Sequence, residues 1–183
     1  MHLEPLRADD RQRVTTILES TAAFSADEVA VALQLFDLAH GGQREVADID
    51  GTAFATALDA DDDYEFVGAR DERGVLLGYA CFGPTPATEG TYDLYWLAVH
   101  ADAQGRGVGR RLVQWVEQDL AQRGARLLVV ETSSRDDYAH TRQFYARGGY
   151  AEVARVRDFY APADDRIIFT TRLTAPAVGA ATR

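Results

Sequence analysis

The chain has 183 residues, of which 46% are hydrophobic and 26% are charged, as is typical of one water-soluble domain. Its formal net charge is -10, and because an acidic surface repels phosphate backbones, we expect no nucleic-acid partner. No apolar run approaches the ~18–20 residues of a membrane span, no signal-peptide pattern is visible, and Cys81 is the only cysteine. We therefore expect a cytoplasmic protein without an intrachain disulfide, a zinc cluster or a membrane partner.

The acidic and histidine side chains bear on possible ligands. The negative charge would attract a cationic small molecule or a basic peptide, or it serves solubility alone. Asp59 and Asp61–Asp63 lack the spacing of a calcium site, and neither His100 nor His140 has a third ligand beside it. We therefore expect no metal.

Local patterns predict seven strands and four helices, which places the chain in the α/β or α+β class. Ser25–Glu28 forms a capping box before a helix, Asp71–Gly74 is typical of a hairpin turn, and the apolar run Leu127–Val130 suits a strand buried on both faces. Residues 1–173 are expected to form one domain. The expected elements are a strand at Leu3–Arg7, a helix capped by Asp9 or Asp10, a helix from Ser25 to Gly41, a loop at Gln43–Asp63 with a short helix around Thr52–Leu58, strands at Tyr64–Arg70, Val75–Phe82 and Thr91–His100, a helix to about Arg123, a strand at Arg126–Thr132, a helix at Tyr138–Arg147, strands at Tyr150–Tyr160 and Arg166–Leu173, and a disordered tail over Thr174–Arg183.

The sharpest motif is a glycine-rich turn between a strand and a helix, Gln104-Gly105-Arg106-Gly107-Val108-Gly109. Glycines let backbone N–H groups point inward, and the positive end of the helix dipole meets them, which favours a bound pyrophosphate. Arg106 and Arg110 would add charge-assisted hydrogen bonds. A turn without a ligand stays open as an alternative. So does a Rossmann dinucleotide loop, although its G-x-G-x-x-G spacing and its place after the first strand are missing.

Two motifs resemble those of the GNAT superfamily of acetyl-CoA-dependent N-acetyltransferases. Leu97–His100 followed by Gln104–Gly109 looks like the family's fourth strand and its Q/R-x-x-G-x-G/A loop, and Thr141–Tyr150 looks like its "FYxxxGF" helix end. The resemblance covers about Tyr64–Leu173. It implies the GNAT fold, a mixed and mostly antiparallel sheet that splays at strands four and five, with acetyl-CoA as co-substrate. The implied cofactor-binding residues are Leu97, Ala98, Val99, Gln104, Gly105, Arg106, Gly107, Val108, Gly109, Arg110, Tyr138 and Thr141, where Tyr138 stands in the place of a family asparagine.

The resemblance also implies a mechanism in which an amine attacks the thioester directly. Tyr145 matches the family tyrosine that protonates the leaving thiolate, and a phenol is a credible acid for that step. Asp93 and Glu131 are the two candidate bases, and a chain of water molecules is the alternative to either. Tyr145 could instead only pack its helix on the sheet, and both carboxylates could be surface acids.

Two rival functions remain at this stage. One is a CoA-binding regulatory module without catalysis, and the other is a transferase of a longer acyl-CoA. The acceptor is expected to be a small-molecule amine or a peptide amine, read by loops that vary freely on one scaffold. We expect a monomer or a homodimer.

Overall fold

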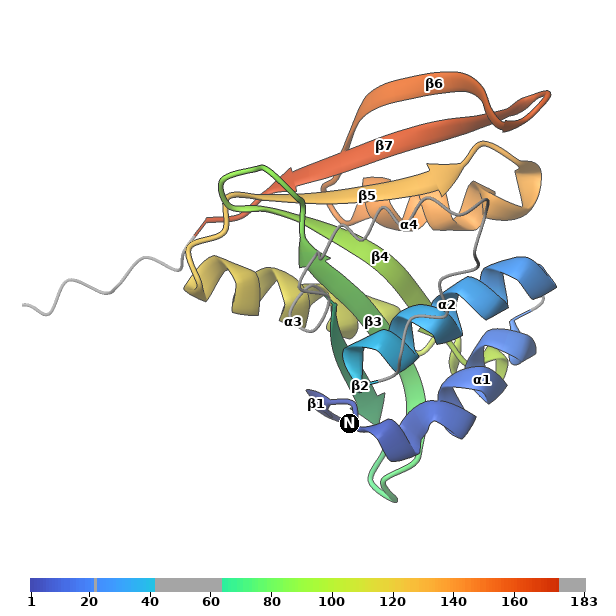
Figure 1. Ribbon diagram of the computed structural model, residues 1–183, viewed down its shortest axis with the longest axis vertical. Helices are drawn as coiled ribbons and strands as arrows, with labels where there is room; N and C mark the ends of the chain where they lie inside the picture. Colours follow the sequence, from blue (N-terminus) through green and yellow to red (C-terminus); the bar gives the residue numbers. More distant parts are fainter. Residues whose placement is uncertain (22, 42–63, 175–183) are drawn as a thin grey trace, which may run out of the picture. The chain divides into compact units, whose positions relative to one another are not determined.

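The computed structural model describes residues 1–21, 23–41 and 64–174 (Figure 1). Four α-helices and seven strands lie in these ranges, together with three short 3-10 turns. The elements are β1 (His2–Pro5), α1 (Arg11–Ser20), α2 (Ala26–Ala39), β2 (Glu65–Arg70), β3 (Leu76–Pro84), β4 (Thr91–Val99), α3 (Val108–Gln122), β5 (Leu127–Ser133), α4 (Ala139–Arg147), β6 (Ala151–Ala161) and β7 (Asp164–Arg172), with 3-10 turns at Ala8–Asp10, Ala101–Ala103 and Asp136–Tyr138.

The strands form one sheet in the order β1-β2-β3-β4-β5-β7-β6. β1 and β2, β2 and β3, β5 and β7, and β6 and β7 pair antiparallel, whereas β4 and β5 pair parallel. The chain passes from β4 to β5 through α3, and a parallel pair is the expected result of such a helical crossover. The predicted fold class is therefore confirmed, with a mixed and mostly antiparallel sheet of seven strands.

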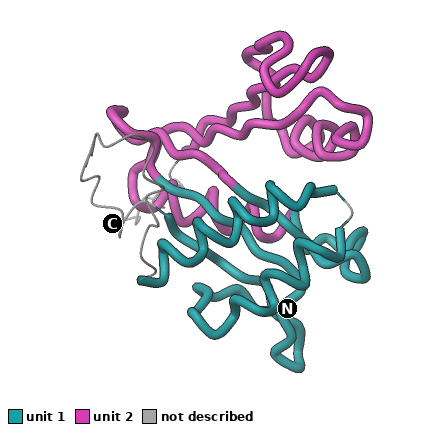
Figure 2. The backbone as a smooth tube through the Cα atoms, turned by 45° about the vertical axis from the view of Figure 1, so that its right-hand side comes forward, with its two compact units in different colours: residues 1–83, 96–109 teal, residues 84–95, 110–183 magenta. Residues whose placement is uncertain are grey.

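The chain divides into two compact units (Figure 2). Unit 1 comprises Met1–Gly83 and Trp96–Gly109, and unit 2 comprises Pro84–Tyr95 and Arg110–Arg183. Both β4 and α3 begin in one unit and end in the other. One domain over residues 1–173 stays a prediction. The predicted short helix at residues 52–58 and, apart from Thr174, the predicted tail lie outside the described residues.

In unit 1, α2 begins where its capping box predicts. The Ser25 hydroxyl accepts a hydrogen bond from the Glu28 backbone N–H at 3.2 Å, and the Glu28 carboxylate accepts one from the Ser25 N–H at 2.7 Å. The helix then packs on β2 through the buried rings of Phe36 and Phe66, whose centroids lie 5.2 Å apart in an edge-to-face arrangement. A local capping signal and one aromatic pair thus fix the start and the inner face of α2.

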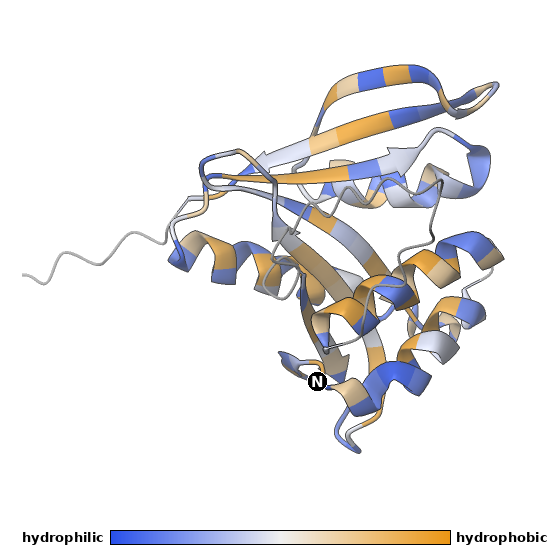
Figure 3. Cartoon of the chain, in the orientation of Figure 1, coloured by the Kyte–Doolittle hydropathy of each residue, from blue (hydrophilic) through white to orange (hydrophobic). Residues whose placement is uncertain are grey.

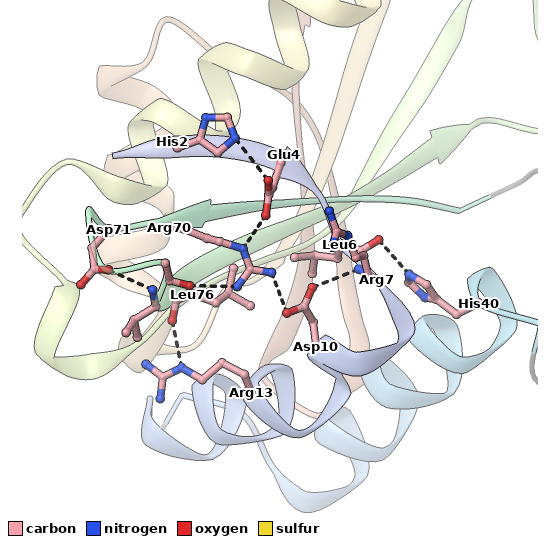
Figure 4. A network of polar contacts seen from close by, with 12 residues as sticks. His2, Glu4, Leu6, Arg7, Asp10, Arg13, His40, Arg70, Asp71 and Leu76 are labelled. Atoms are coloured by element: carbon pink, nitrogen blue, oxygen red, sulfur yellow. Dashed lines mark hydrogen bonds and ion pairs between the residues drawn. The ribbon is translucent and has the colours of Figure 1, made fainter.

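An arginine ties the N-terminal strand to β2 (Figure 4). The Arg70 guanidinium donates to Glu4 at 2.7 Å, to Asp10 at 2.6 Å and to the Gly74 carbonyl at 3.2 Å. Asp10 also accepts from the Arg7 backbone N–H at 3.0 Å, but its side chain makes no capping bond to α1. The predicted N-cap therefore lies at the right residue, but its carboxylate accepts hydrogen bonds from Arg70 and from the turn before the helix instead of capping α1.

Three predictions about strands need correction. β3 runs to Pro84, two residues past its predicted end, and β7 begins at Asp164 instead of Arg166. Asp164 is buried because its carboxylate accepts hydrogen bonds from the Ser133 hydroxyl and the Ser134 N–H, so an acidic residue there does not mark a turn. Within the predicted run Leu127–Val130, Leu128 and Val130 are buried whereas Leu127 and Val129 are half-buried, so this run is fully buried on one face only.

The helix that follows the glycine turn agrees with its apolar pattern. Apolar and polar residues alternate along α3 with the period of a helix (Figure 3). Its buried residues are Val108, Leu112, Val113, Val116, Leu120 and Ala121. The helix ends at Gln122, and Gly124, two residues later, has a φ of +83° and donates to the Ala121 carbonyl, as predicted for a glycine after a helix end.

Candidate functional site

The glycine turn lies in unit 1, between the end of β4 and the start of α3. Gly105 has a φ of +71° and Gly107 a φ of +79°, a backbone conformation that residues with a Cβ rarely adopt. A Cβ added at either position would meet no atom within 4 Å, so the turn needs glycine for its backbone and leaves the space above it open. Gln104, Gly105, Arg106 and Gly107 are all exposed.

The strand end before this turn is held in place by three hydrogen bonds. The His100 N–H donates to the Leu77 carbonyl of β3 at 2.8 Å, and the Gln104 side-chain amide donates to the Val99 carbonyl at 3.2 Å. The His100 ring accepts from the Asp102 N–H at 3.3 Å and so caps the intervening 3-10 turn. Gln104 therefore links the strand to the loop within the motif.

This turn suits an anionic ligand. The first N–H groups of α3 have no acceptor within the helix, and they carry the positive end of its dipole. Arg106 and Arg110 are exposed next to them. A cavity of about 420 Å³ adjoins the loop in unit 1 and is lined by Met1, Asp71, Glu72, Arg73, Leu77, Arg106 and Val108. The open glycines, the helix start and Arg106, all in unit 1, together fit a pyrophosphate.

In unit 2 the ladder between β4 and β5 is short. It runs from the pair Thr91 and Leu127 to the pair Leu94 and Val130. β5 continues to pair with β7 as far as Ser133, which lies opposite Arg166. Within the described residues, the last part of β5 is thus paired along its β7 edge, beyond the last pair with β4.

The first candidate base, Asp93, lies on β4 in unit 2. The Thr85 hydroxyl donates to its carboxylate at 2.6 Å, and Asp93 is half-buried. One hydrogen bond leaves further lone pairs of the carboxylate available. Thr85 directly follows β3 in the sequence, and no local pattern indicated that it would reach Asp93.

The second candidate base, Glu131, forms an ion pair with Arg166 on β7. The Arg166 guanidinium also lies over the ring of Phe159, 4.8 Å from its centroid. An ion pair with a guanidinium stabilises the charged form of a carboxylate, so a paired carboxylate is a weaker base than a free one. Sequence reasoning missed Arg166 as a partner of Glu131 because the two residues meet only through the pairing of β5 with β7.

Tyr145, the candidate acid, lies on α4 in unit 2 with 4% of its surface exposed. Its ring packs against Tyr150 and Phe169, with centroids 5.3 Å and 6.2 Å away. Burial raises the pKa of the Tyr145 phenol above its usual value, so the hydroxyl stays protonated at neutral pH. The Tyr150 hydroxyl next to it donates to Glu117 at 2.6 Å.

Tyr138 and Thr141 lie at the start of α4, also in unit 2. Tyr138 is the residue before the first turn, and the Arg135 guanidinium lies 5.4 Å from the centre of its ring. Both Tyr138 and Thr141 are half-buried. An aromatic ring stacked with an arginine therefore occupies the place where the resemblance implies an asparagine.

The predicted site residues divide between the two units. Leu97 to Gly109 lie in unit 1, whereas Asp93, Arg110, Glu131, Tyr138, Thr141 and Tyr145 lie in unit 2. Within the described parts of the chain, no three His, Cys, Asp or Glu side chains gather as a metal site would need, and none of the described helices is long and apolar enough to cross a membrane.

The chain resembles several known proteins. Residues 32–150 match the model of the acetyltransferase (GNAT) family. A GNAT-family acetyltransferase of known structure from Desulfovibrio desulfuricans is 38% identical, with a TM-score of 0.79 over 94% of this chain and 99% of that one. An aminoglycoside 6'-N-acetyltransferase, solved in complex with coenzyme A, shares the fold at 15% identity, with a TM-score of 0.67 over 96% of this chain and 99% of that one.

A curated relative is the S-(2-succino)cysteine N-acetyltransferase of Bacillus subtilis, which is 28% identical over 69 residues. That match spans 38% of this chain and 42% of the relative. The family match covers more than half of the chain, and the glycine turn and the parallel β4–β5 pair stand where the family resemblance implies them. The chain belongs to the acetyltransferase (GNAT) family.

Proposed function

We propose that this protein transfers the acetyl group of acetyl-CoA to an amine by direct attack. The observation that carries the proposal is the open turn before α3, where Gly105 and Gly107 have positive φ and a helix begins. Such a turn binds pyrophosphate through backbone N–H groups. When bound, acetyl-CoA supplies an activated acetyl thioester.

The turn and the strand end before it are assigned to the co-substrate. Backbone N–H groups of Gln104–Gly109, with Arg106 and Arg110, would bind the pyrophosphate. Backbone groups of Leu97, Ala98 and Val99 would bind the pantetheine arm as an added strand. Because the His100 N–H already bonds to Leu77 of β3, the arm would use the other edge of this strand.

Tyr145 is assigned as the acid that donates the proton of its hydroxyl to the leaving sulfur. Support comes from the match of Tyr145 to the tyrosine of the family motif and from its hydroxyl, which is protonated at neutral pH. Burial raises the pKa of this phenol and so makes it a weaker acid than an exposed tyrosine. We assign the removal of the amine proton to Asp93 in preference to Glu131. Within the described residues, Asp93 accepts one hydrogen bond, from the neutral hydroxyl of Thr85, whereas Glu131 is already paired with Arg166.

The acceptor is proposed to be a small-molecule amine or a peptide amine. Relatives named for aminoglycosides and for S-(2-succino)cysteine support the small-molecule class. A CoA-binding module without catalysis, and a transferase of longer acyl groups, remain the competing proposals.

A panel of amine acceptors incubated with acetyl-CoA, with release of free thiol as the readout, tests the proposal. Turnover that depends on both the acceptor and acetyl-CoA is expected. Acetyl-CoA binding without turnover of any acceptor would favour the regulatory module. A higher kcat/KM for butyryl-CoA than for acetyl-CoA would favour the longer acyl group.

A further inference from the structure

One arginine of unit 2 has an incomplete set of partners. The Arg166 side chain is 28% exposed, and its Nη2 atom pairs with Glu131. Its Nε atom is buried and has no hydrogen-bond partner among the described residues. Buried polar atoms are normally hydrogen-bonded, so an unpaired guanidinium N–H calls for a partner that binds there.

The side chain above this guanidinium is exposed and yet held in place. Phe159 is 48% exposed and lies in an irregular stretch of β6 between Val156 and Ala161. The Asp165 carboxylate accepts from the Asp158 N–H at 3.0 Å and from the Arg155 side chain at 2.6 Å.

Asp158, which has a φ of +50°, in turn accepts from the Ala163 N–H at 2.7 Å. These bonds fix the backbone that carries Phe159. The Phe159 ring therefore covers one face of the Arg166 guanidinium and not the edge that bears Nε and Nη2. Glu131 lies at that edge and pairs with Nη2.

That edge matches a carboxylate. The Nε and Nη2 atoms of arginine point in parallel and bind both oxygens of one carboxylate side by side. Glu131 engages Nη2 and leaves Nε unpaired. A ligand carboxylate in place of Glu131 would satisfy both N–H groups, and the released Glu131 would return to water.

We propose that Arg166 binds a carboxylate of the acceptor, and that Glu131 is the resting partner which the acceptor displaces. The acceptor class is therefore an amino acid or a related amine that carries a nearby carboxylate. The inference rests on the proposed function. Arg166 lies opposite Ser133, in the part of β5 beyond its last pair with β4.

The charge of the chain gives this arginine a further role. A net charge of -10 disfavours placing a carboxylate group against the protein, so an acceptor that carries one binds better beside a local cation. Arg166 supplies that cation, and Phe159 shields it from water on one face. If the pair with Glu131 were only a cross-strand contact, acceptors with and without a carboxylate would react alike.

The test compares L-amino acids with their carboxamides and with the corresponding amines that lack the carboxylate. Readouts are kcat/KM from thiol release and, without turnover, the rise in Tm that each compound causes in the presence of CoA. Wild-type protein should prefer the acids by roughly 10- to 100-fold, the usual size of a hydrogen bond to a charged group. Equal values for acids and amides in both readouts would overturn the inference.

Arg166→Gln should abolish this preference by raising KM for the acids alone, and Arg166→Lys should restore part of it. Arg172→Gln is the matched control, because it removes the same charge from an exposed position at the other end of β7 and should keep the preference. Loss of the preference in both variants would contradict a specific role of Arg166. Acid-selective binding without turnover would support the inference and contradict the proposed transferase.

Glu131→Gln provides a second test that keeps Arg166 intact. A resting partner that no longer carries a charge is displaced more easily, so KM for the acids should fall several-fold while KM for the amides stays unchanged. A large fall in kcat for every acceptor would show instead that Glu131 is the base, and the resting role would be wrong.

Discussion

Gly107→Glu tests the assignment of the pyrophosphate to the turn before α3. Gly107 has a φ of +79°, and a Cβ there would meet nothing within 4 Å, so the side chain fits and only the backbone conformation is unfavourable. That conformation destabilises a residue with a Cβ by roughly 1–2 kcal/mol. For a chain of this size, each 1 kcal/mol lowers Tm by roughly 2–4 °C. The free variant should therefore melt a few degrees lower but remain folded.

The effect on the ligand is larger. Acetyl-CoA at 100 times its Kd stabilises the wild-type fold by about 2.7 kcal/mol, which raises Tm by roughly 5–11 °C. A carboxylate about 4 Å from a phosphate charge repels it by roughly 1–4 kcal/mol, and pyrophosphate presents two such charges. Even the lower value, counted for both charges, weakens binding by roughly 30-fold. This leaves a stabilisation of at most about 0.9 kcal/mol and a Tm shift of about 3.5 °C or less.

Thermal unfolding with and without acetyl-CoA measures both quantities. Gly124→Glu is the matched control, because Gly124 has a φ of +83°, has the same open space, and lies just past the other end of α3. It should lose similar intrinsic stability and keep the full ligand shift. A full shift in folded Gly107→Glu, or an equal loss in Gly124→Glu, would refute the reasoning.

Three further predictions concern the acid, the N-terminal ion pairs and pH. Tyr145→Phe should lower kcat by roughly 10²-fold with KM for acetyl-CoA unchanged. Tyr150→Phe, which loses its bond to Glu117, should reduce stability and leave kcat nearly unchanged. Stopped-flow and steady-state kinetics measure kcat and KM of both variants. Arg70→Met removes the guanidinium that donates to both Glu4 and Asp10, and it should reduce the unfolding free energy by roughly 1–3 kcal/mol in urea titrations. Arg11→Met, whose pair with Asp37 is exposed, should reduce it by less than about 1 kcal/mol. The pKa of Asp37 is lowered by the hydrogen bond from Arg11, and the pKa of Asp165 is lowered by the bond from the Asp158 N–H. The two carboxylates therefore stabilise the fold above pH ~4, and this contribution is lost as pH falls through their folded-state pKa. Urea unfolding between about pH 6 and 3 should show the decline, and a flat profile would contradict it.

Features that depend on neighbouring residues could be predicted from the sequence. The capping box at Ser25 and Glu28 brings both partners within one helical turn, and the structure shows both hydrogen bonds. Gly105 and Gly107 likewise indicate a turn in their own stretch of backbone, and both adopt positive φ in the structure. The order of strands and helices follows from the same local signals.

Features that depend on distant residues could not be predicted. Asp164 belongs to a strand because Ser133, 31 positions earlier, donates to its carboxylate. Glu131 meets Arg166 only through the register of β5 and β7, which a single sequence does not encode locally. The sequence accordingly indicated the two candidate bases, but it contained no sign that Glu131 is paired.

Transfer of a labelled acetyl group tests the central claim most directly. Purified protein is incubated with isotopically labelled acetyl-CoA and a panel of amines, and the products are identified by mass spectrometry. The account predicts an N-acetylated amine that carries the label, formed at a rate that falls strongly in Tyr145→Phe and in Gly107→Glu. Labelled acetyl-CoA that binds and remains unreacted with every amine, or product formed at the same rate by both variants, would contradict it.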